Sequence, residues 1–189
     1  MKINKQGLLD VGEYLESPNA DERPLDVNIS LIVVHGISLP PGEYGGNWIS
    51  DLFLNQLDSD ADPYFEEISE LKVSSHVLIR RGGEIVQYVP FAKRAWHAGE
   101  SCFQGQHSCN DFSIGIELEG VDDQEYEPVQ YEQLSKLTTV LLKEYPAITE
   151  DRITGHENIA PGRKTDPGEA FDWGLFRKLL ASYQKVDNT

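Results

Sequence analysis

Three side chains in this sequence have the types and spacing that could hold a metal ion. His35 follows the apolar run 29–34, and His156 and Asp166 lie more than a hundred residues later. Two imidazoles and one carboxylate suit Zn²⁺, and three protein ligands leave a fourth tetrahedral position for water, as in catalytic zinc sites. Spacing alone does not show that the three converge. Each histidine could instead be a hydrogen-bonded core residue, and Asp166 could start a turn.

Length and composition predict one folded domain. The chain has 189 residues, of which 39% are hydrophobic, so a single domain spanning 1–189 can bury a sizeable core. Residues 1–27 are polar and contain two prolines, and we expect an irregular arm lying on that core. The sequence has no apolar run of about eighteen residues and no apolar signal segment at its start. We therefore expect a cytoplasmic protein.

The net charge bears on possible partners, and the cysteine content bears on disulfides. A formal net charge of −16 makes nucleic acid and anionic membranes poor partners, although a bias towards solubility explains the same charge. No obligate protein partner is inferred. Cys102 and Cys109 are too few for a disulfide framework, and we expect free thiols.

The elements that must position these residues alternate between strands and helices. Apolar periodicity predicts strands over 29–34 and 112–119, and a hairpin whose arms, 75–80 and 84–89, flank the turn at 81–83. Helices are predicted after Asn47 through Leu57, from Pro128 towards Tyr145, and after Asp172 through Leu180. This order predicts an α/β fold with a mixed central β-sheet packed by helices.

Glu117 is the best candidate for moving protons. On strand 112–119, four apolar side chains face one way, while Ser113, Gly115, Glu117 and Glu119 face the other. We expect Gly115 to leave room for a ligand beside Glu117. Burying a carboxylate without a partner costs free energy, so a catalytic role is one explanation for Glu117. The alternative is an exposed glutamate on a half-solvated strand.

Five separated blocks add a family resemblance. They are residues 33–42, 75–90, 94–99, 109–120 and 155–168. Together they resemble the zinc-dependent N-acetylmuramoyl-L-alanine amidases, in particular those that act on 1,6-anhydro muropeptides in cell-wall recycling. The likeness runs from about Ile29 to Trp173. It implies the fold shared by these amidases and the peptidoglycan recognition proteins. It also implies one Zn²⁺ and hydrolysis of the amide between the muramoyl lactyl group and L-alanine.

The resemblance also implies roles for individual residues. His35, His156 and Asp166 would be the zinc ligands, and the ion would lower the pKa of its water to about 7 and polarise a bound carbonyl. Glu117 would accept the water proton and pass it to the leaving amine. Lys164 would stabilise the developing oxyanion, although a solvated loop lysine is the ordinary alternative.

Candidate substrate contacts are less distinctive. Trp96 could offer an aromatic face to the sugar, Lys72 or Arg80 could meet peptide carboxylates, and Asn110 could hydrogen-bond the substrate. Core packing, solvated surface cations and a turn cap are the respective alternatives. Gly36 stands where relatives often carry asparagine, so a contact there is lost or made by the backbone.

Three other functions fit parts of the sequence. A peptidoglycan-binding module of the same fold need hold no zinc. A glycosidase could use Glu117 and Glu119, which share a face about 6.5–7 Å apart. A cysteine hydrolase could use Cys102 or Cys109, although neither lies in a recognisable nucleophile motif.

His97 could hold the second nitrogen of a metal-bound imidazole.

Overall fold

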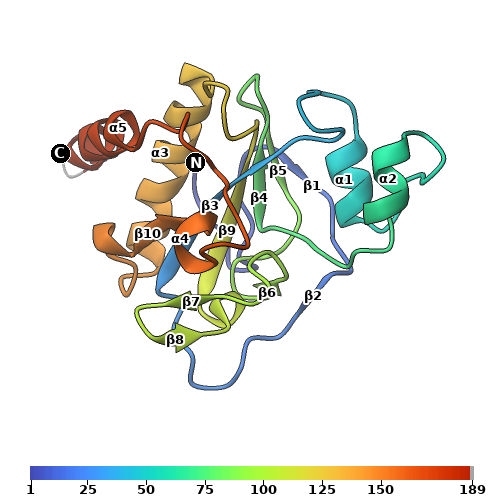
Figure 1. The fold of residues 1–189 in the computed structure, drawn as a ribbon. Helices are drawn as coiled ribbons and strands as arrows, with labels where there is room; N and C mark the ends of the chain where they lie inside the picture. Colours follow the sequence, from blue (N-terminus) through green and yellow to red (C-terminus); the bar gives the residue numbers. More distant parts are fainter. Residues whose placement is uncertain (188–189) are drawn as a thin grey trace.

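A six-stranded sheet forms the centre of the computed structural model, which describes residues 1–187 (Figure 1). Its strand order is β1-β5-β4-β9-β3-β10. The strands are β1 (Glu13–Tyr14), β3 (Leu31–Ile37), β4 (Val77–Ile79), β5 (Ile85–Gln87), β9 (Ser113–Glu119) and β10 (Ile153–Gly155). Strands β4, β9, β3 and β10 are parallel, β5 is antiparallel to β4, and β1 is parallel to β5. The mixed sheet and the β4–β5 hairpin are thus confirmed.

Helices and short strands surround this sheet. The helices are α1 (Trp48–Phe53), α2 (Pro63–Ile68), α3 (Pro128–Glu144), α4 (His156–Ile159) and α5 (Trp173–Asp187), with 3₁₀ turns η1 (Cys109–Asp111) and η2 (Glu150–Arg152). Two small sheets pair β2 (Ala20–Asp21) with β6 (Arg94–Ala95), and β7 (Cys102–Phe103) with β8 (Gln106–His107). Figure 1 shows α3 and α5 on one side of the central sheet and α1 and α2 on the other. In the described part of the chain, no helix combines the length and apolarity needed to cross a bilayer.

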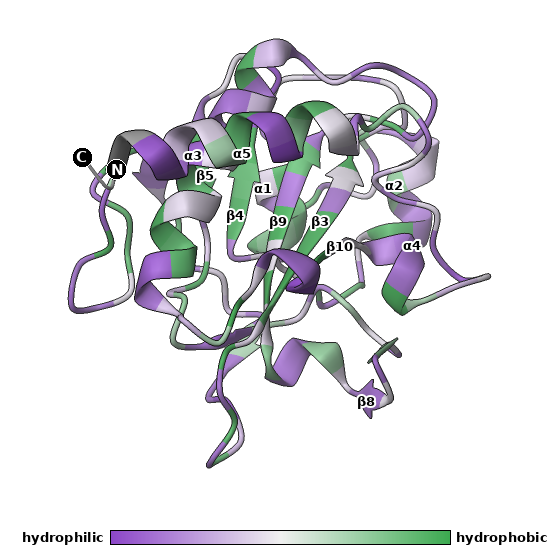
Figure 2. Cartoon of the chain, turned by 90° about the vertical axis from the view of Figure 1, so that its left-hand side faces the viewer, coloured by the Kyte–Doolittle hydropathy of each residue, from purple (hydrophilic) through white to green (hydrophobic). Residues whose placement is uncertain are grey.

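One face of the sheet carries the main core, and the other carries the candidate site residues. Figure 2 shows α3 and α5 lying across largely apolar strands, and their side chains close the main core over this face. That core includes Ile32, Val34, Ile114, Ile116, Leu134, Leu137, Leu141, Phe176 and Leu180. On the opposite face, α1, α2 and the loops pack over Leu78 and Tyr88, while Leu31 and Val33 belong to a third cluster. His35 and Glu117 alternate onto this second face, between the two smaller clusters.

Several predicted boundaries need correction. The first predicted strand runs from Leu31 to Ile37 rather than over 29–34, so His35 lies within a strand and not at its end. All seven residues of β9 are buried, because helices and loops cover both faces of the sheet. The reading of Glu117 as an exposed residue on a half-solvated strand is therefore wrong. Helix α1 ends at Phe53 and does not reach Leu57.

The N-terminal arm is largely irregular, as predicted, but it also contains β1 and β2. Arg23 anchors the arm by donating hydrogen bonds to the carbonyls of Phe91, Asn110 and Ser113. Such backbone bonding by a buried guanidinium ties the arm to the strand that carries Glu117. At the other end of the chain, Asp172 caps α5 as predicted, accepting the N–H of Leu175.

Candidate active site

Strand register places the candidate metal ligands together. Within the parallel sheet, His35 of β3 pairs with Glu117 of β9, so both side chains leave the same face. On the other side of β3, Gly155 of β10 pairs with Val34. The next residue in the chain, His156, begins α4 and lies beside His35. Two ligands separated by 121 residues in the chain thus meet because two short strands pair.

The three predicted ligands converge on one point. The Nδ1 atoms of His35 and His156 lie 3.0 Å apart, and Asp166 Oδ2 lies 3.1 Å from each. Ligand atoms bound at 2.0–2.1 Å to a tetrahedral ion lie about 3.3 Å from one another. Two nitrogens and one carboxylate oxygen also match the donor preference of Zn²⁺. These residues fit the implied ion in spacing and chemistry.

Protonation states at this cluster favour a cation. Burial lowers the pKa of His35 to about 4, so its imidazole is neutral near pH 7. Burial acts to raise the pKa of Asp166, but the hydrogen bonds with His156 and His35 outweigh burial and leave that pKa below its ordinary value. A neutral imidazole beside an ionised carboxylate is the form in which these side chains bind metal.

Glu117 lies beside the cluster with one oxygen unpaired. The residue is 7% exposed, and Oε1 lies 4.0 Å from Nδ1 of His35. Among the described residues, its buried Oε2 has no hydrogen-bond partner. Burial, reinforced by Asp166 and opposed by Lys164, raises the pKa of Glu117 well above its ordinary value. A carboxylate kept dry next to a ligand set is suited to exchanging protons with a reactant.

A cleft of about 680 Å³ opens in front of these residues. Lys164 is exposed on the loop that carries Asp166, and it lines this cleft together with the ligands and Glu117. The loop is held by the Tyr126 hydroxyl, which donates to Pro167 O over 2.9 Å, and by Glu157 N–H, which donates to Asp166 O over 3.0 Å. The cleft wall opposite this loop is apolar and includes Leu52, Phe53, Tyr64, Ile68 and Leu71.

Both ligand histidines use their second nitrogen. His35 Nε2 lies 2.9 Å from Nδ1 of His97, and His156 Nε2 lies 3.2 Å from the carbonyl of Ala98. A Cβ on Gly115 would lie 2.4 Å from the ring of His97. The glycine therefore makes room for an imidazole, and the expectation that it leaves space for a ligand is wrong.

The predicted substrate contacts occupy different surroundings. Trp96 is half-buried, and its indole hydrogen-bonds the carboxylate of Asp21. Asn110 Oδ1 accepts two backbone N–H groups. Lys72 is exposed and lies between two residues that line the cleft. Gly36 lines the cleft with its backbone. A side chain would not fit there, because a Cβ would lie 2.3 Å from the Tyr126 hydroxyl. Contact of these residues with a substrate stays a prediction.

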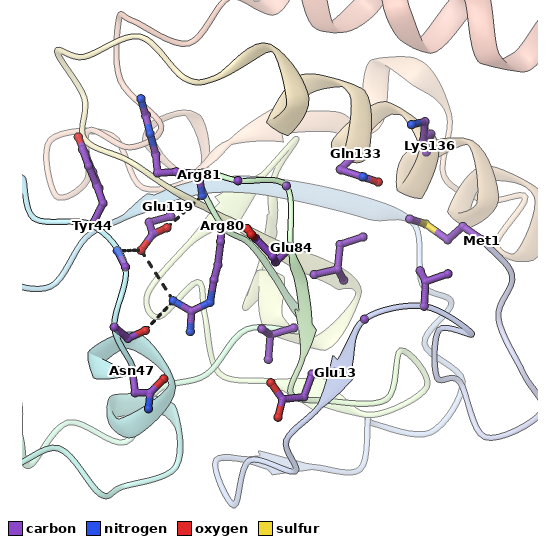
Figure 3. A pocket seen from close by; sticks show the side chains of 18 residues that line it. Met1, Glu13, Tyr44, Asn47, Arg80, Arg81, Glu84, Glu119, Gln133 and Lys136 are labelled. Carbon is purple, nitrogen blue, oxygen red and sulfur yellow. Dashed lines mark hydrogen bonds and ion pairs between the residues drawn. The ribbon is translucent and has the colours of Figure 1, made fainter.

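Glu119 and Arg80 belong to a different cavity. Figure 3 shows this second cavity, of about 1050 Å³, where Glu119 accepts the N–H groups of Gly45 and Arg81 over 2.7 and 3.0 Å. Arg80 lies 3.8 Å from the same carboxylate and donates to the carbonyl of Gly46. Glu119 therefore joins two loops, and this bonding argues against a glycosidase pair with Glu117.

The surroundings of Cys109 are not those of a nucleophile. Cys102 and Cys109 are free thiols, as predicted. Burial raises the pKa of the Cys109 thiol. A reactive cysteine needs a lowered pKa, so this environment argues against a cysteine hydrolase that uses Cys109.

Comparison with known proteins agrees with this geometry. Residues 25–169 match the family of N-acetylmuramoyl-L-alanine amidases. The chain is 60% identical over 176 residues to the 1,6-anhydro-N-acetylmuramyl-L-alanine amidase AmpD of Salmonella typhimurium, covering 93% of this chain and 94% of that protein.

Two solved structures show the same fold. A crystal structure of a selenomethionine AmpD derivative has a TM-score of 0.92 and 58% identity, covering 95% of this chain and 99% of that one. A complex of the amidase AmiD from Escherichia coli with anhydro-N-acetylmuramic acid-L-Ala-D-gamma-Glu-L-Lys has a TM-score of 0.58 and 28% identity. That match covers 84% of this chain and 60% of AmiD.

Proposed function

The chain belongs to the N-acetylmuramoyl-L-alanine amidase family, and from this we propose how its own residues perform the reaction. The protein is an amidase that cleaves the amide between the lactyl group of (1,6-anhydro-)N-acetylmuramic acid and L-alanine. In our proposal, His35, His156 and Asp166 hold one Zn²⁺, Glu117 transfers protons, and Lys164 stabilises charge. The convergence of the three ligand atoms within 4.8 Å carries this proposal.

Glu117 manages the protons of the hydrolysis. A Zn²⁺ ion held by the three ligands supplies Lewis acidity, which polarises a carbonyl and lowers the pKa of water to about 7. The carboxylate of Glu117 accepts a proton as water attacks the amide carbon. It then donates that proton to the nitrogen of L-alanine as the carbon–nitrogen bond breaks. The products are the free lactyl carboxylic acid and the amino terminus of the peptide.

Lys164 meets the charge that develops on the carbonyl oxygen. It is tethered two residues before Asp166, and it influences the pKa values of both His35 and Glu117 electrostatically. A cation in this position stabilises an oxyanion more than the neutral carbonyl it comes from. Its charge also favours the ionised form of Glu117, which is the form that accepts a proton.

The cleft suits a substrate with two chemical halves. Its apolar wall can cover the sugar or acyl part, while the exposed Lys72 supplies a cation for the carboxylates of a peptide. Trp96, Asn110 and Gly36 complete the proposed substrate contacts. We place the enzyme in the cytoplasm, in the recycling of cell-wall muropeptides.

Product analysis with and without metal tests this assignment. Purified protein loaded with zinc, and the same protein after chelation, are each incubated with an anhydromuropeptide and examined by mass spectrometry. Free peptide and free anhydro-sugar are expected only in the zinc-loaded sample, and returning zinc to the chelated sample should restore them. Zinc-loaded protein that leaves the substrate intact would refute the amidase assignment and favour a binding module. Equal hydrolysis without metal would refute the ligand assignment.

A further inference from the structure

We propose that the dipeptide His97–Ala98, held by the side chain of Asn110, positions both ligand histidines and determines which nitrogen of each faces the metal. The inference rests on the zinc site proposed above and deepens it. It follows from the direction of a series of hydrogen bonds, because a carbonyl oxygen can only accept. Both series end on such a carbonyl.

The first series reaches His35. The carbonyl of Cys109 accepts a hydrogen bond of 2.5 Å from the hydroxyl of Ser113, so this hydroxyl has spent its only proton. Its oxygen, 3.0 Å from Nε2 of His97, must therefore accept a hydrogen bond from the N–H at that position. Nδ1 of His97 is then the acceptor, and His35 donates Nε2–H to it over 2.9 Å. This leaves the lone pair on Nδ1 of His35 facing the other two ligands.

The second series reaches His156 in a single step. Its Nε2 lies 3.2 Å from the carbonyl of Ala98, which requires the proton on Nε2 and leaves the lone pair on Nδ1. Arg163 donates to the same carbonyl over 2.6 Å and to the carbonyl of Glu100, also over 2.6 Å. These bonds hold the acceptor in place at the edge of the cleft.

Together, the two series leave two nitrogen lone pairs facing one point, beside a carboxylate oxygen. Two Nδ1 lone pairs 3.0 Å apart, each 3.1 Å from a carboxylate oxygen, present three electron-pair donors with no proton among them. Three such donors repel one another unless a cation lies between them. Neighbouring groups that fix the tautomer and orientation of ligand imidazoles raise metal affinity in this way.

Asn110 holds the dipeptide that serves both series. Its Oδ1 accepts the N–H of His97 over 3.1 Å and that of Ala98 over 2.8 Å. The ring of His97 is further confined by Gly115, where a Cβ would lie 2.4 Å from it. One amide oxygen therefore aligns the acceptors of both metal ligands. This is a positioning role, which is separate from the substrate contact proposed above for the same residue.

Paired substitutions separate positioning from folding and from substrate contact. Asn110→Leu removes the shared acceptor, whereas Asn110→Asp keeps an oxygen that can accept both N–H groups. His97→Leu removes the acceptor of His35, whereas His97→Asn keeps an oxygen near the position of Nδ1. As a matched control, His76→Asn alters another buried histidine of the same region. Its ring nitrogens face the N–H of Gly115, the carbonyl of Lys93 and the guanidinium of Arg23, and none of its hydrogen bonds is to a candidate metal ligand.

Zinc affinity, measured by competition with a chromogenic chelator, is the main readout. We expect Asn110→Leu and His97→Leu to bind zinc about 10–100-fold more weakly. Asn110→Asp, His97→Asn and the control His76→Asn should stay within a few-fold of the parent. Thermal unfolding of each metal-free variant shows whether it is folded. If Asn110 only contacts substrate, Asn110→Leu will change KM and leave zinc affinity unaltered, which overturns the proposal.

Nitrogen-15 NMR of the metal-free parent protein gives a test that needs no substitution. We expect both His35 and His156 to carry their proton on Nε2. A proton on Nδ1 of either histidine overturns the inference even if every variant fails to fold. A parent protein that binds no zinc would instead refute the proposed function. Zinc binding and hydrolysis by the parent, together with unchanged affinity in both leucine variants, refute only the positioning role.

Discussion

Replacement of Glu117 by glutamine is the sharpest test of the mechanism. Glutamine keeps the shape of the side chain but cannot accept a proton near neutral pH. General acid–base catalysis contributes about 10²–10⁴ in rate, which equals about 3–5 kcal/mol of activation free energy. Oε1 lies 4.0 Å from Nδ1 of His35, which places the carboxylate within the proposed site, and we expect kcat to fall within this range.

Stability should respond differently from activity in this variant. Glu117 is a buried carboxyl group whose Oε2 lacks a hydrogen-bond partner among the described residues, and burial raises its pKa well above the ordinary value, so its ionisation opposes folding in the metal-free protein. Glutamine cannot ionise, and we expect the free energy of unfolding of the metal-free variant to be at least as high as that of the parent. Denaturant titration measures this difference.

Glu119→Gln is the matched control on the same strand. Its carboxylate accepts two backbone N–H groups, so glutamine should lower the free energy of unfolding by about 1–3 kcal/mol while kcat stays close to that of the parent. Both variants are assayed by release of free peptide from an anhydromuropeptide at saturating zinc. A variant Glu117→Gln that retains more than about a tenth of the parental kcat has lost less rate than general acid–base catalysis contributes. In that case Glu117 is not the proton-transfer group.

Four further outcomes are expected. Lys164→Ala should lower kcat by about 10²–10³, with Lys164→Arg in between and zinc affinity unchanged in both; equal loss in the two variants contradicts a charge-stabilising role. Zinc at about a thousand times its Kd should stabilise the parent by about 4 kcal/mol in calorimetry, and an unchanged melting temperature would exclude binding to the folded state. Gly115→Ala should lower the free energy of unfolding by about 1–3 kcal/mol in urea titration, because its Cβ meets the ring of His97. Burial raises the pKa of Glu157 from 4.5 to about 7, so its stabilising contribution is complete below the lower value and is lost as pH rises through about 7. The melting temperature of metal-free Glu157→Gln should therefore fall less over this pH interval than that of the parent, and parallel curves would contradict the assigned pKa.

Long periodic segments were the most predictable part of the fold. The β-branched run before His35 and the apolar pattern after Pro128 each predicted an element that is present, because one period repeats over enough residues to define it. Strand β10 has three residues and helix α4 has four, which is too short for any period to show. Yet these elements place His156, so the convergence of the ligands depends on pairing that local patterns do not encode.

Individual side chains at the site show the same limit. The sequence pattern located Glu117 on the correct face, but it did not show that the neighbouring space at Gly115 is filled by His97. From the sequence, Asn110 could be either a substrate contact or a turn cap, and only its two backbone hydrogen bonds show what its oxygen does here. A sequence identifies chemical types, whereas the occupant of a space depends on residues far away in the chain.

The pairing of β10 with β3 has a consequence for how the protein acquires its metal. A nascent chain that ends before Ile153 has the first histidine but neither of the other two ligands, and it lacks the edge strand that aligns them. Contacts of such high sequence separation form late, because long loops must close before they yield any stabilisation. Ion capture should therefore follow completion of the sheet, and a truncated or misregistered product would stay metal-poor. Zinc binding would therefore indicate that the chain has been synthesised and folded past β10 and the residues that follow it.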